Sequence, residues 1–273
     1  MNAPLAVIAG SGRFPFHVAR GAKRQGLSVI ALGIRGWVDP ALQREVERFE
    51  AVDVGELGRL IERLSAHGVR QAVMAGKVTK GVLLDRRTAF DQETQRLLQG
   101  LGDFSVASLL GAIGARLTAA GVTLLDASTF VADELCPEGV LTPRQPGPSE
   151  AADIALGLGA ARALAAFDVG QTVIVKNKVV IAVEALEGTD AAIRRAHALA
   201  GGGLVVVKTA SPNHDRRFDL PVVGLDTLTT LREAQASCLA MEAGAALILD
   251  RPAFLQAAAA AGICVVGARL PAG

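Results

Sequence analysis

Charged side chains gather in one loop in the last third of the chain. The stretch "KTASPNHDRRFDL" brings Lys208, Arg216 and Asp219 together between two apolar segments, although only 20% of the whole chain is charged. Lysine and arginine can contact phosphate oxygens, and a carboxylate can bind a divalent cation or orient a water molecule. These residue types favour a site for phosphate and its counter-cation, and a solvated connection between two strands is the simpler alternative.

A second candidate is the segment "EALEGTDAAIRR", in which a glycine turn leads into a predicted helix. Gly188 and Thr189 stand at the expected start of this helix, where free N–H groups can hold an anion. Asp190 follows and could face a cation. Simple capping and complementation of the helix dipole would explain the same three residues, so both interpretations stay open on this signal alone.

In the N-terminal half, "AGSGRFP" and "AGKVTKG" each end a strand-like apolar run. Gly10, Ser11 and Gly12 resemble half of a dinucleotide fingerprint, in which glycines let the backbone approach phosphate. The third glycine and the ribose-binding acid are missing, which disfavours a nicotinamide dinucleotide. Lys77 follows the fourth predicted strand, at the edge where open parallel sheets bind ligands. These residues are expected to contact an anion, with a plain turn and an exposed lysine as the alternatives.

The composition argues against several other kinds of site. The net charge is +1 without a basic tract, and aromatic residues make up 4% with no tyrosine, so nucleic acid is not an expected partner. The three cysteines lie far apart in the sequence and indicate reduced thiols rather than a disulfide framework or a zinc site. Any metal is therefore expected to be a hard cation with oxygen ligands, such as Mg²⁺.

No segment predicts insertion into a membrane. The N-terminus lacks the basic and apolar regions of a signal peptide, and the most apolar stretch, "FLQAAAAAGICVVGA", is too short to span a bilayer. We expect a soluble, cytoplasmic protein, and peripheral contact with a membrane surface stays compatible with the sequence.

The apolar runs predict the elements that must position these residues. Residues 1–133 alternate short strands with amphipathic helices, which indicates βαβ units and a parallel, Rossmann-like sheet. The domain boundary is expected near Asp133 to Pro137, and the rest of the Pro- and Gly-rich stretch "ELCPEGVLTPRQPGPSE" is expected to belong to the second domain. Ser149 is expected to cap the helix that follows. Residues 138–273 are expected to form a second α/β domain.

The second domain is expected to contain a mixed sheet. Asn177 and Lys178, between "QTVIVK" and "VVIAVEAL", predict a tight hairpin and therefore antiparallel pairing. The rest of the chain continues an α/β alternation, in which "DTLTTLREAQASCLAMEAG" is helical. The fold class is therefore α/β with two domains, and the cleft between two such domains is where a small ligand is expected to bind.

Together these motifs resemble a known family, the UDP-2,3-diacylglucosamine diphosphatases of the LpxI type, which act in lipid A biosynthesis. The resemblance is carried by "VIAGSGRFP", "AGKV", "LTPRQPGPSEAADI", "DVGQTVIVKNKVVIAVEALEGTDAAIRR" and "FDLPVVGLDTL", in order over nearly the whole chain. It implies a Rossmann-like domain and a second α/β domain with the ligand between them. It also implies Mg²⁺-assisted hydrolysis of a pyrophosphate, and it carries the functional acid onto Asp219.

Two places depart from the family pattern. The family has Arg-Pro where this chain has Lys80-Gly81, and Gly-Asp-Asp where it has Gly102-Asp103-Phe104. The resemblance therefore carries no contact over to these positions.

Residues and resemblance together predict an enzyme that uses Mg²⁺ to hydrolyse UDP-2,3-diacylglucosamine to UMP and 2,3-diacylglucosamine 1-phosphate. The expected catalytic residues are Asp219, Lys208 and Asp190, the expected metal ligands are Asp219 and Asp190, and the expected substrate contacts are Gly10, Ser11, Gly12, Lys77, Gly188, Thr189 and Arg216. The expected partners are the lipid-nucleotide substrate and, transiently, the cytoplasmic face of the inner membrane, and a homodimer is left open. The alternatives are a nucleotide-sugar oxidoreductase and a non-catalytic nucleotide-sugar sensor.

Overall fold

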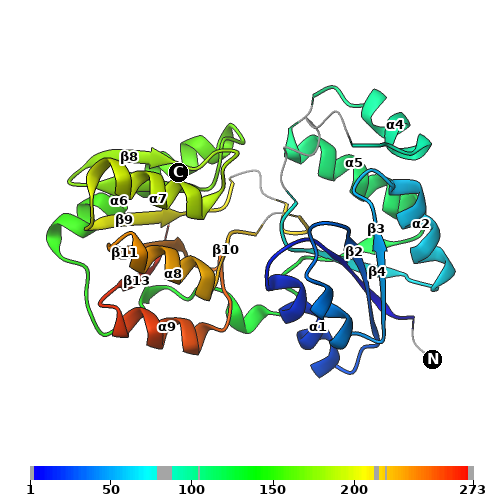
Figure 1. The fold of residues 1–273 in the computed structure, drawn as a ribbon, viewed down its shortest axis with the longest axis horizontal. Coiled ribbons are helices and arrows are strands. Elements are labelled where there is room, and N and C mark those ends of the chain that lie inside the picture. Colours follow the sequence, from blue (N-terminus) through cyan, green and yellow to red (C-terminus); the bar gives the residue numbers. More distant parts are fainter. Residues whose placement is uncertain (1–2, 79–87, 104, 212–214, 219, 270–273) are drawn as a thin grey trace. The chain divides into compact units, whose positions relative to one another are not determined.

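The chain forms two compact units in the computed structural model, which describes residues 3–78, 88–103, 105–211, 215–218 and 220–269 (Figure 1). Unit 1 comprises Met1–Ala132 and Asp215–Phe218, and unit 2 comprises Asp133–His214 and Asp219–Gly273. The short segment Asp215–Phe218 thus belongs to unit 1, although its neighbours in sequence on both sides belong to unit 2.

Unit 1 contains a five-stranded parallel sheet with the strand order β3-β2-β1-β4-β5. Its strands are β1 (Leu5–Ala9), β2 (Val29–Ile34), β3 (Arg48–Val52), β4 (Gln71–Ala75) and β5 (Thr123–Leu124). Its helices are α1 (Phe14–Arg24), the 3₁₀ helix η1 (Pro40–Arg44), α2 (Leu57–Ala66), α4 (Gln92–Gln99) and α5 (Val106–Ala119). This confirms the parallel, Rossmann-like N-terminal domain.

The central strand of this sheet is buried on both faces because every residue of β1 is apolar. On one face, Ile8 of β1 joins Leu64 of α2 and Leu117 of α5 in a single core cluster, against which Phe218 of the inserted segment packs. Side chains alternate along a strand, so Leu5, Val7 and Ala9 point to the opposite face, and α1 contacts β1, β2 and β4. Covered faces on both sides are what a parallel sheet requires.

Unit 2 contains a six-stranded mixed sheet with the order β6-β13-β11-β9-β7-β8, and a separate parallel pair, β10 and β12. Its strands are β6 (Gly139–Val140), β7 (Thr172–Lys176), β8 (Val179–Val183), β9 (Leu204–Lys208), β10 (Val222–Val223), β11 (Ala236–Glu242), β12 (Leu247–Ile248) and β13 (Cys264–Ala268). Its helices are α6 (Pro148–Ala166), α7 (Thr189–Ala200), α8 (Leu225–Glu233) and α9 (Arg251–Ala260), with the 3₁₀ helix η2 (Ala132–Glu134) at the boundary. The predicted mixed sheet is confirmed, while the ligand cleft stays a prediction.

The hairpin predicted at Asn177 and Lys178 is present, with β7 antiparallel to β8. Asn177 has a φ of 51° and Lys178 a φ of 62°, as a turn with two left-handed residues requires. The carboxylate of Asp153 on α6 accepts hydrogen bonds from both turn amides, at 2.9 and 2.5 Å. The turn is therefore held to the helix, and the far ends of β7 and β8 are brought side by side.

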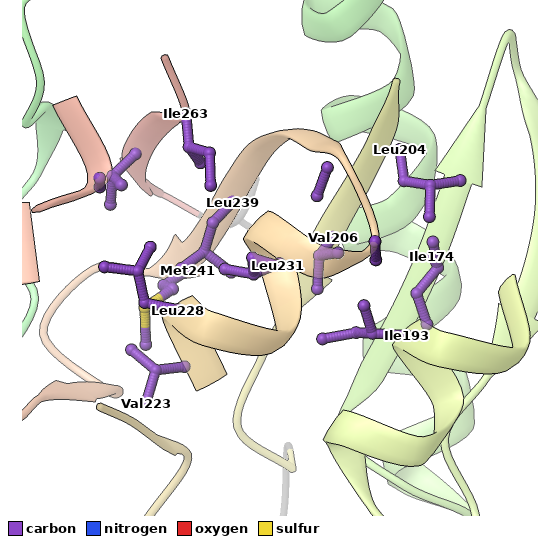
Figure 2. Packing of buried hydrophobic residues seen from close by; sticks show 14 of the residues in the cluster. Ile174, Ile193, Leu204, Val206, Val223, Leu228, Leu231, Leu239, Met241 and Ile263 are labelled. Carbon is purple, nitrogen blue, oxygen red and sulfur yellow. The ribbon is translucent and has the colours of Figure 1, made fainter. Parts of the chain in front are cut away.

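The main core of unit 2 lies between the sheet and helices α7 and α8 (Figure 2). In this cluster Ile193 of α7 and Leu231 of α8 pack with Val206 of β9 and Met241 of β11. Full burial of one such aliphatic side chain contributes about 1.5–3 kcal/mol. Helix α6 covers the other face, where Leu158 packs on the alternate residues of β9 and β11.

The prediction of one helix for "DTLTTLREAQASCLAMEAG" is wrong. Helix α8 ends at Glu233, Gln235 takes a left-handed conformation with a φ of 51°, and the chain then enters β11. Strand β11 pairs with β9 on one side and β13 on the other, so it occupies the interior of the sheet.

The predicted capping role of Ser149 is also wrong. Helix α6 begins at Pro148, and Gly147 is its N-cap residue. The carboxylate of Glu150, the third residue of the helix, accepts a hydrogen bond from the N–H of Gly147 at 2.8 Å, which is the bond that an acid supplies in a capping box.

Cys136, Cys238 and Cys264 are all free and buried, as the expectation of reduced thiols requires. Among the residues that the structure describes, no helix has both the length and the apolar character needed to cross a bilayer.

Candidate functional site

Three neighbouring strands of unit 2 place two opposite charges and a hydroxyl group in one row. Lys208 ends β9, and Thr172, at the start of β7, lies directly opposite it. Glu184 follows β8, and its N–H donates to the carbonyl of Thr172 at 2.8 Å. Residues opposite one another in antiparallel strands share a face of the sheet, so this row lies on the face that α7 covers.

The ammonium group of Lys208 is buried within this row. It donates to Oγ1 of Thr172 at 3.0 Å and to Oγ1 of Thr189 at 2.9 Å, and it lies 3.6 Å from Oε2 of Glu184. Only 4% of Lys208 and 8% of Glu184 is exposed. An isolated charge at such depth would be costly, so the carboxylate explains how a charged lysine is accommodated there.

The start of α7 adds a second source of positive potential. Gly188 is the N-cap residue with a φ of 85°, and no side chain among the described residues caps the helix at this point. Thr189 is the first residue of the helix and holds the Lys208 ammonium. The first N–H groups of a helix have no partner within it and attract anions, so the structure brings the predicted residues Gly188, Thr189 and Lys208 together at a position suited to phosphate.

Asp190 is the second residue of α7 and is half-buried. Its Oδ1 atom is buried and has no hydrogen-bond partner among the described part of the chain. A carboxylate oxygen left in this state is the type of ligand that Mg²⁺ prefers, so Asp190 fits its predicted role. The other predicted ligand, Asp219, lies outside the described residues.

The predicted N-terminal residues come together where β1 and β4 lie side by side. The strand order reverses its direction between these two strands, and open α/β sheets bind ligands outside the carboxyl ends of strands at such a point. Ser11 and Lys77 exchange backbone hydrogen bonds of 2.9 and 3.0 Å, and Oγ of Ser11 donates to the Lys77 carbonyl at 2.9 Å. Gly10 allows this approach, because a Cβ there would lie 2.8 Å from the Lys77 carbonyl oxygen. Gly12, with a φ of 89°, then leads toward α1.

Arg216 lies within unit 1 and is engaged by residues that the sequence did not point to. Its Nε lies 2.8 Å from Oδ2 of Asp126, and its Nη2 donates to Oγ of Ser128 at 2.9 Å. Its carbonyl accepts the N–H of Ala127 at 2.9 Å. These contacts hold the segment Asp215–Phe218 in unit 1, and the predicted contact of Arg216 with substrate stays a prediction.

Thr172 and Glu184 were not predicted as site residues, although the hairpin that carries them contains a signal. Counting outward from the turn places Thr172 opposite Val183. A bulge after Ile174 shifts the register by one residue, so Glu184 takes that place. A hydroxyl and an acid at the open end of a predicted hairpin, next to a strand that ends in lysine, would have marked the site.

Two family models match the chain, the LpxI N-terminal domain over residues 4–134 and the LpxI C-terminal domain over residues 137–266. A relative from Caulobacter vibrioides, the UDP-2,3-diacylglucosamine pyrophosphatase LpxI, is 30% identical over 277 residues, with 96% of each chain covered. Among solved structures, the biotin carboxylase subunit of pyruvate carboxylase aligns with 73% of this chain, and the alignment covers 43% of that subunit. The identity is 11% and the TM-score is 0.28, so this likeness is too weak to support an argument. The matches over both halves show that this chain belongs to the LpxI family.

Proposed function

We propose that this protein hydrolyses the pyrophosphate bond of UDP-2,3-diacylglucosamine, the compound in the name of its Caulobacter vibrioides relative. Addition of water across this bond gives UMP and 2,3-diacylglucosamine 1-phosphate, and the reaction belongs to lipid A biosynthesis. The observation that carries the proposal is the 2.9 Å contact between the buried ammonium of Lys208 and the hydroxyl of Thr189 at the start of α7. This contact holds the positive charge of Lys208 at the start of α7, where the diphosphate is proposed to bind.

Positive charge matters because the oxygens of a diphosphate repel an incoming nucleophile. In unit 2, the ammonium of Lys208 and the first N–H groups of α7 offset this repulsion. In unit 1, the backbone from Gly10 to Gly12 and the exposed Lys77 offer a second set of donors for the same substrate. We propose that the first N–H groups of α7 and the donors of unit 1 contact phosphate oxygens, while the buried Lys208 acts through its charge from behind the first turn of the helix.

Asp190 and Asp219 are proposed to hold Mg²⁺. The buried Oδ1 of Asp190, which lacks a hydrogen-bond partner among the described residues, supports its part in this proposal. When bound, Mg²⁺ would offset the charge on the phosphate oxygens. Asp219 is also proposed to orient the attacking water through its carboxylate.

Release of UMP from UDP-2,3-diacylglucosamine by the full chain tests this function. We expect release in the presence of Mg²⁺ and none after removal of divalent ions with EDTA, with UDP-glucose as a control that shares the nucleotide but lacks acyl chains. Binding of the lipid nucleotide without release of UMP would indicate a sensor instead. Tight binding of NADH, measured by nicotinamide fluorescence, would indicate an oxidoreductase.

We also propose transient contact with the cytoplasmic face of the inner membrane, because the substrate is an amphiphile that carries two acyl chains. Sedimentation of the protein with phospholipid vesicles, with and without the lipid nucleotide in them, tests this contact. We expect the bound fraction to rise when the vesicles contain the substrate, and an equal fraction in both cases would contradict the proposal.

A further inference from the structure

We propose that Glu184 is a positioning residue for the phosphate site and acts through Lys208 and Thr189. This inference rests on the proposed function. One buried carboxylate contacts both groups, since Oε1 accepts the hydroxyl hydrogen of Thr189 at 2.9 Å and Oε2 lies 3.6 Å from the ammonium of Lys208. The residue thus links the strand end that carries the charge to the helix start that is expected to receive the anion.

The backbone of Glu184 is itself held on two sides. Its N–H continues the β7–β8 ladder by donating to the carbonyl of Thr172 at 2.8 Å. Gly170 packs so closely against it that a Cβ at that glycine would lie 2.1 Å from the carbonyl oxygen of Glu184. Arg195 of α7 also donates to the carbonyl of Val183 at 2.8 Å, which ties the preceding residue to the helix. The carboxylate is therefore presented from a fixed point.

For Lys208, this carboxylate adds a counter-charge beside two hydrogen-bond acceptors. The ammonium group donates to the hydroxyls of Thr172 and Thr189, and Oε2 of Glu184 lies 3.6 Å away as the opposite charge of the ion pair. A lysine stem is flexible and would otherwise let the charge turn toward other partners. We infer that Lys208 acts as a fixed positive charge behind the first turn of α7, with Thr189 between its ammonium group and the phosphate. Glu184 keeps the ammonium group in this position.

For Thr189, the same carboxylate fixes the direction of the hydroxyl group. The hydroxyl has a single hydrogen, which it donates to Glu184, while its oxygen accepts from Lys208. These two bonds hold the first residue of α7 from opposite sides, and with it the N–H groups of the first turn. Removal of the carboxylate would free Thr189 and leave a buried ammonium without its counter-charge.

A purely structural role for the same contacts leads to a different expectation. Removal of one partner of a buried ion pair is strongly destabilising, whereas replacement of both by neutral side chains of similar size is often tolerated. A neutral pair at positions 184 and 208 would therefore restore the fold without restoring the charge. The double variant Glu184→Gln/Lys208→Met separates the two roles.

The experiment measures Tm and kcat/KM for UDP-2,3-diacylglucosamine in the full chain with Glu184→Gln, Lys208→Met or both. We expect each single variant to lower Tm, the double variant to recover most of that loss, and all three to lose about 10²-fold in kcat/KM. Glu184→Asp, which keeps the charge on a shorter stem, is expected to give an intermediate loss. Glu233→Gln removes an exposed acid that lies 3.9 Å from Arg194, and this control should match the wild type.

Recovery of both Tm and kcat/KM in the double variant would show that the contacts serve only the fold and would overturn the proposal. Wild-type kcat/KM in Glu184→Gln would overturn it as well. If the wild-type protein released no UMP, the proposed function would fail instead, and calorimetric binding of inorganic pyrophosphate would then test the site. We expect the double variant to bind pyrophosphate more weakly than the wild type does. Equal binding by the wild type and the double variant, or no binding by either, would reject the role of Glu184.

Discussion

The ammonium nitrogen of Lys208 lies 2.9 Å from the hydroxyl oxygen of Thr189, the first residue of α7. One residue ends a buried strand and the other begins a helix, so a buried charge and the positive end of a helix dipole meet at one point. The carboxylate of Glu184 contacts both side chains and compensates the charge within the protein. This relationship gives the C-terminal half of the chain a place suited to a diphosphate.

Asp219→Ala is expected to abolish turnover and leave substrate binding largely intact. The acid is proposed to act on the metal and on water rather than on the substrate, so kcat should fall by about 10³-fold or more. Release of UMP and calorimetric binding of the lipid nucleotide measure the two effects separately. Asp226→Asn, at an exposed acid in the first turn of α8, is the control. Turnover like that of the wild type would remove Asp219 from the mechanism.

Gly76→Ala is expected to weaken substrate binding by disturbing the pairing of Ser11 with Lys77. Gly76 has a φ of 89°, and a Cβ there would lie 2.6 Å from the carbonyl oxygen of Ser11. The two loops would have to separate, so we expect KM to rise about tenfold with a smaller change in kcat, a loss of about 1.4 kcal/mol.

Gly26→Ala is the matched control for this change. Gly26 has a φ of 78°, and a Cβ there would meet nothing within 4 Å. Both variants carry the left-handed strain of about 1–2 kcal/mol, but only Gly76→Ala brings a clash. Equal KM values in the two variants would show that the loop pairing does not contribute to binding.

Gly111→Ala and Gly114→Ala, both in α5, are expected to change the stability of unit 1 in opposite directions. Alanine is favoured over glycine in a helix interior by about 1 kcal/mol. A Cβ at Gly111 has open space, whereas one at Gly114 would lie 2.9 Å from Cζ of Phe218. In thermal unfolding followed by circular dichroism, Tm should rise for the first variant and fall for the second. A rise in both would mean that the Phe218 ring moves aside at no cost.

The ion pair of Arg144 with Glu150 is expected to make stability depend on pH in the acid range. Two guanidinium nitrogens each donate to one carboxylate oxygen at 2.8 Å, and chiefly this hydrogen bonding lowers the pKa of Glu150 from 4.5 to about 2. Because the folded pKa is the lower one, the contribution is fully present above pH 4.5 and is lost as the pH falls from 4.5 toward 2.

Glu150→Gln tests this dependence. We expect it to reduce the free energy of unfolding by about 2 kcal/mol near neutral pH, a figure below the full pKa shift because Arg144 is partly exposed to solvent. The difference from the wild type should shrink below pH 4.5. Urea unfolding of both proteins at several pH values measures it, and a difference that stays constant with pH would contradict the assignment.

The elements of the fold with a clear local signal could be predicted from the sequence. The apolar run at β1 predicted a strand of a parallel sheet, and Asn177 with Lys178 predicted the hairpin. Strand β11 could not be recognised, because its residues "ASCLAME" include several good helix formers and follow a helix without a glycine or a proline. Its pairing with β9 and β13 overrides that local preference, and only the left-handed Gln235 marks the break.

The candidate site could be predicted in part. The glycine turn before α7 and the lysine at the end of β9 were recognisable because each is a local pattern. The contacts of Glu184 depend on a one-residue register shift in the hairpin, and those of Arg216 depend on the packing of its segment into unit 1. Both are consequences of tertiary structure that no short window of sequence contains.

The segment Asp215–Phe218 has a consequence for attempts to divide this protein. A gene fragment that stops at residue 132 encodes a first half in which Asp126 lacks its arginine and the α5 surface lacks the ring of Phe218. Chimeras that swap halves between homologues must therefore take residues 215–218 from the same parent as residues 1–132. Recombination at the proline-rich junction alone is expected to yield mismatched hybrids, even when each parent is a working protein.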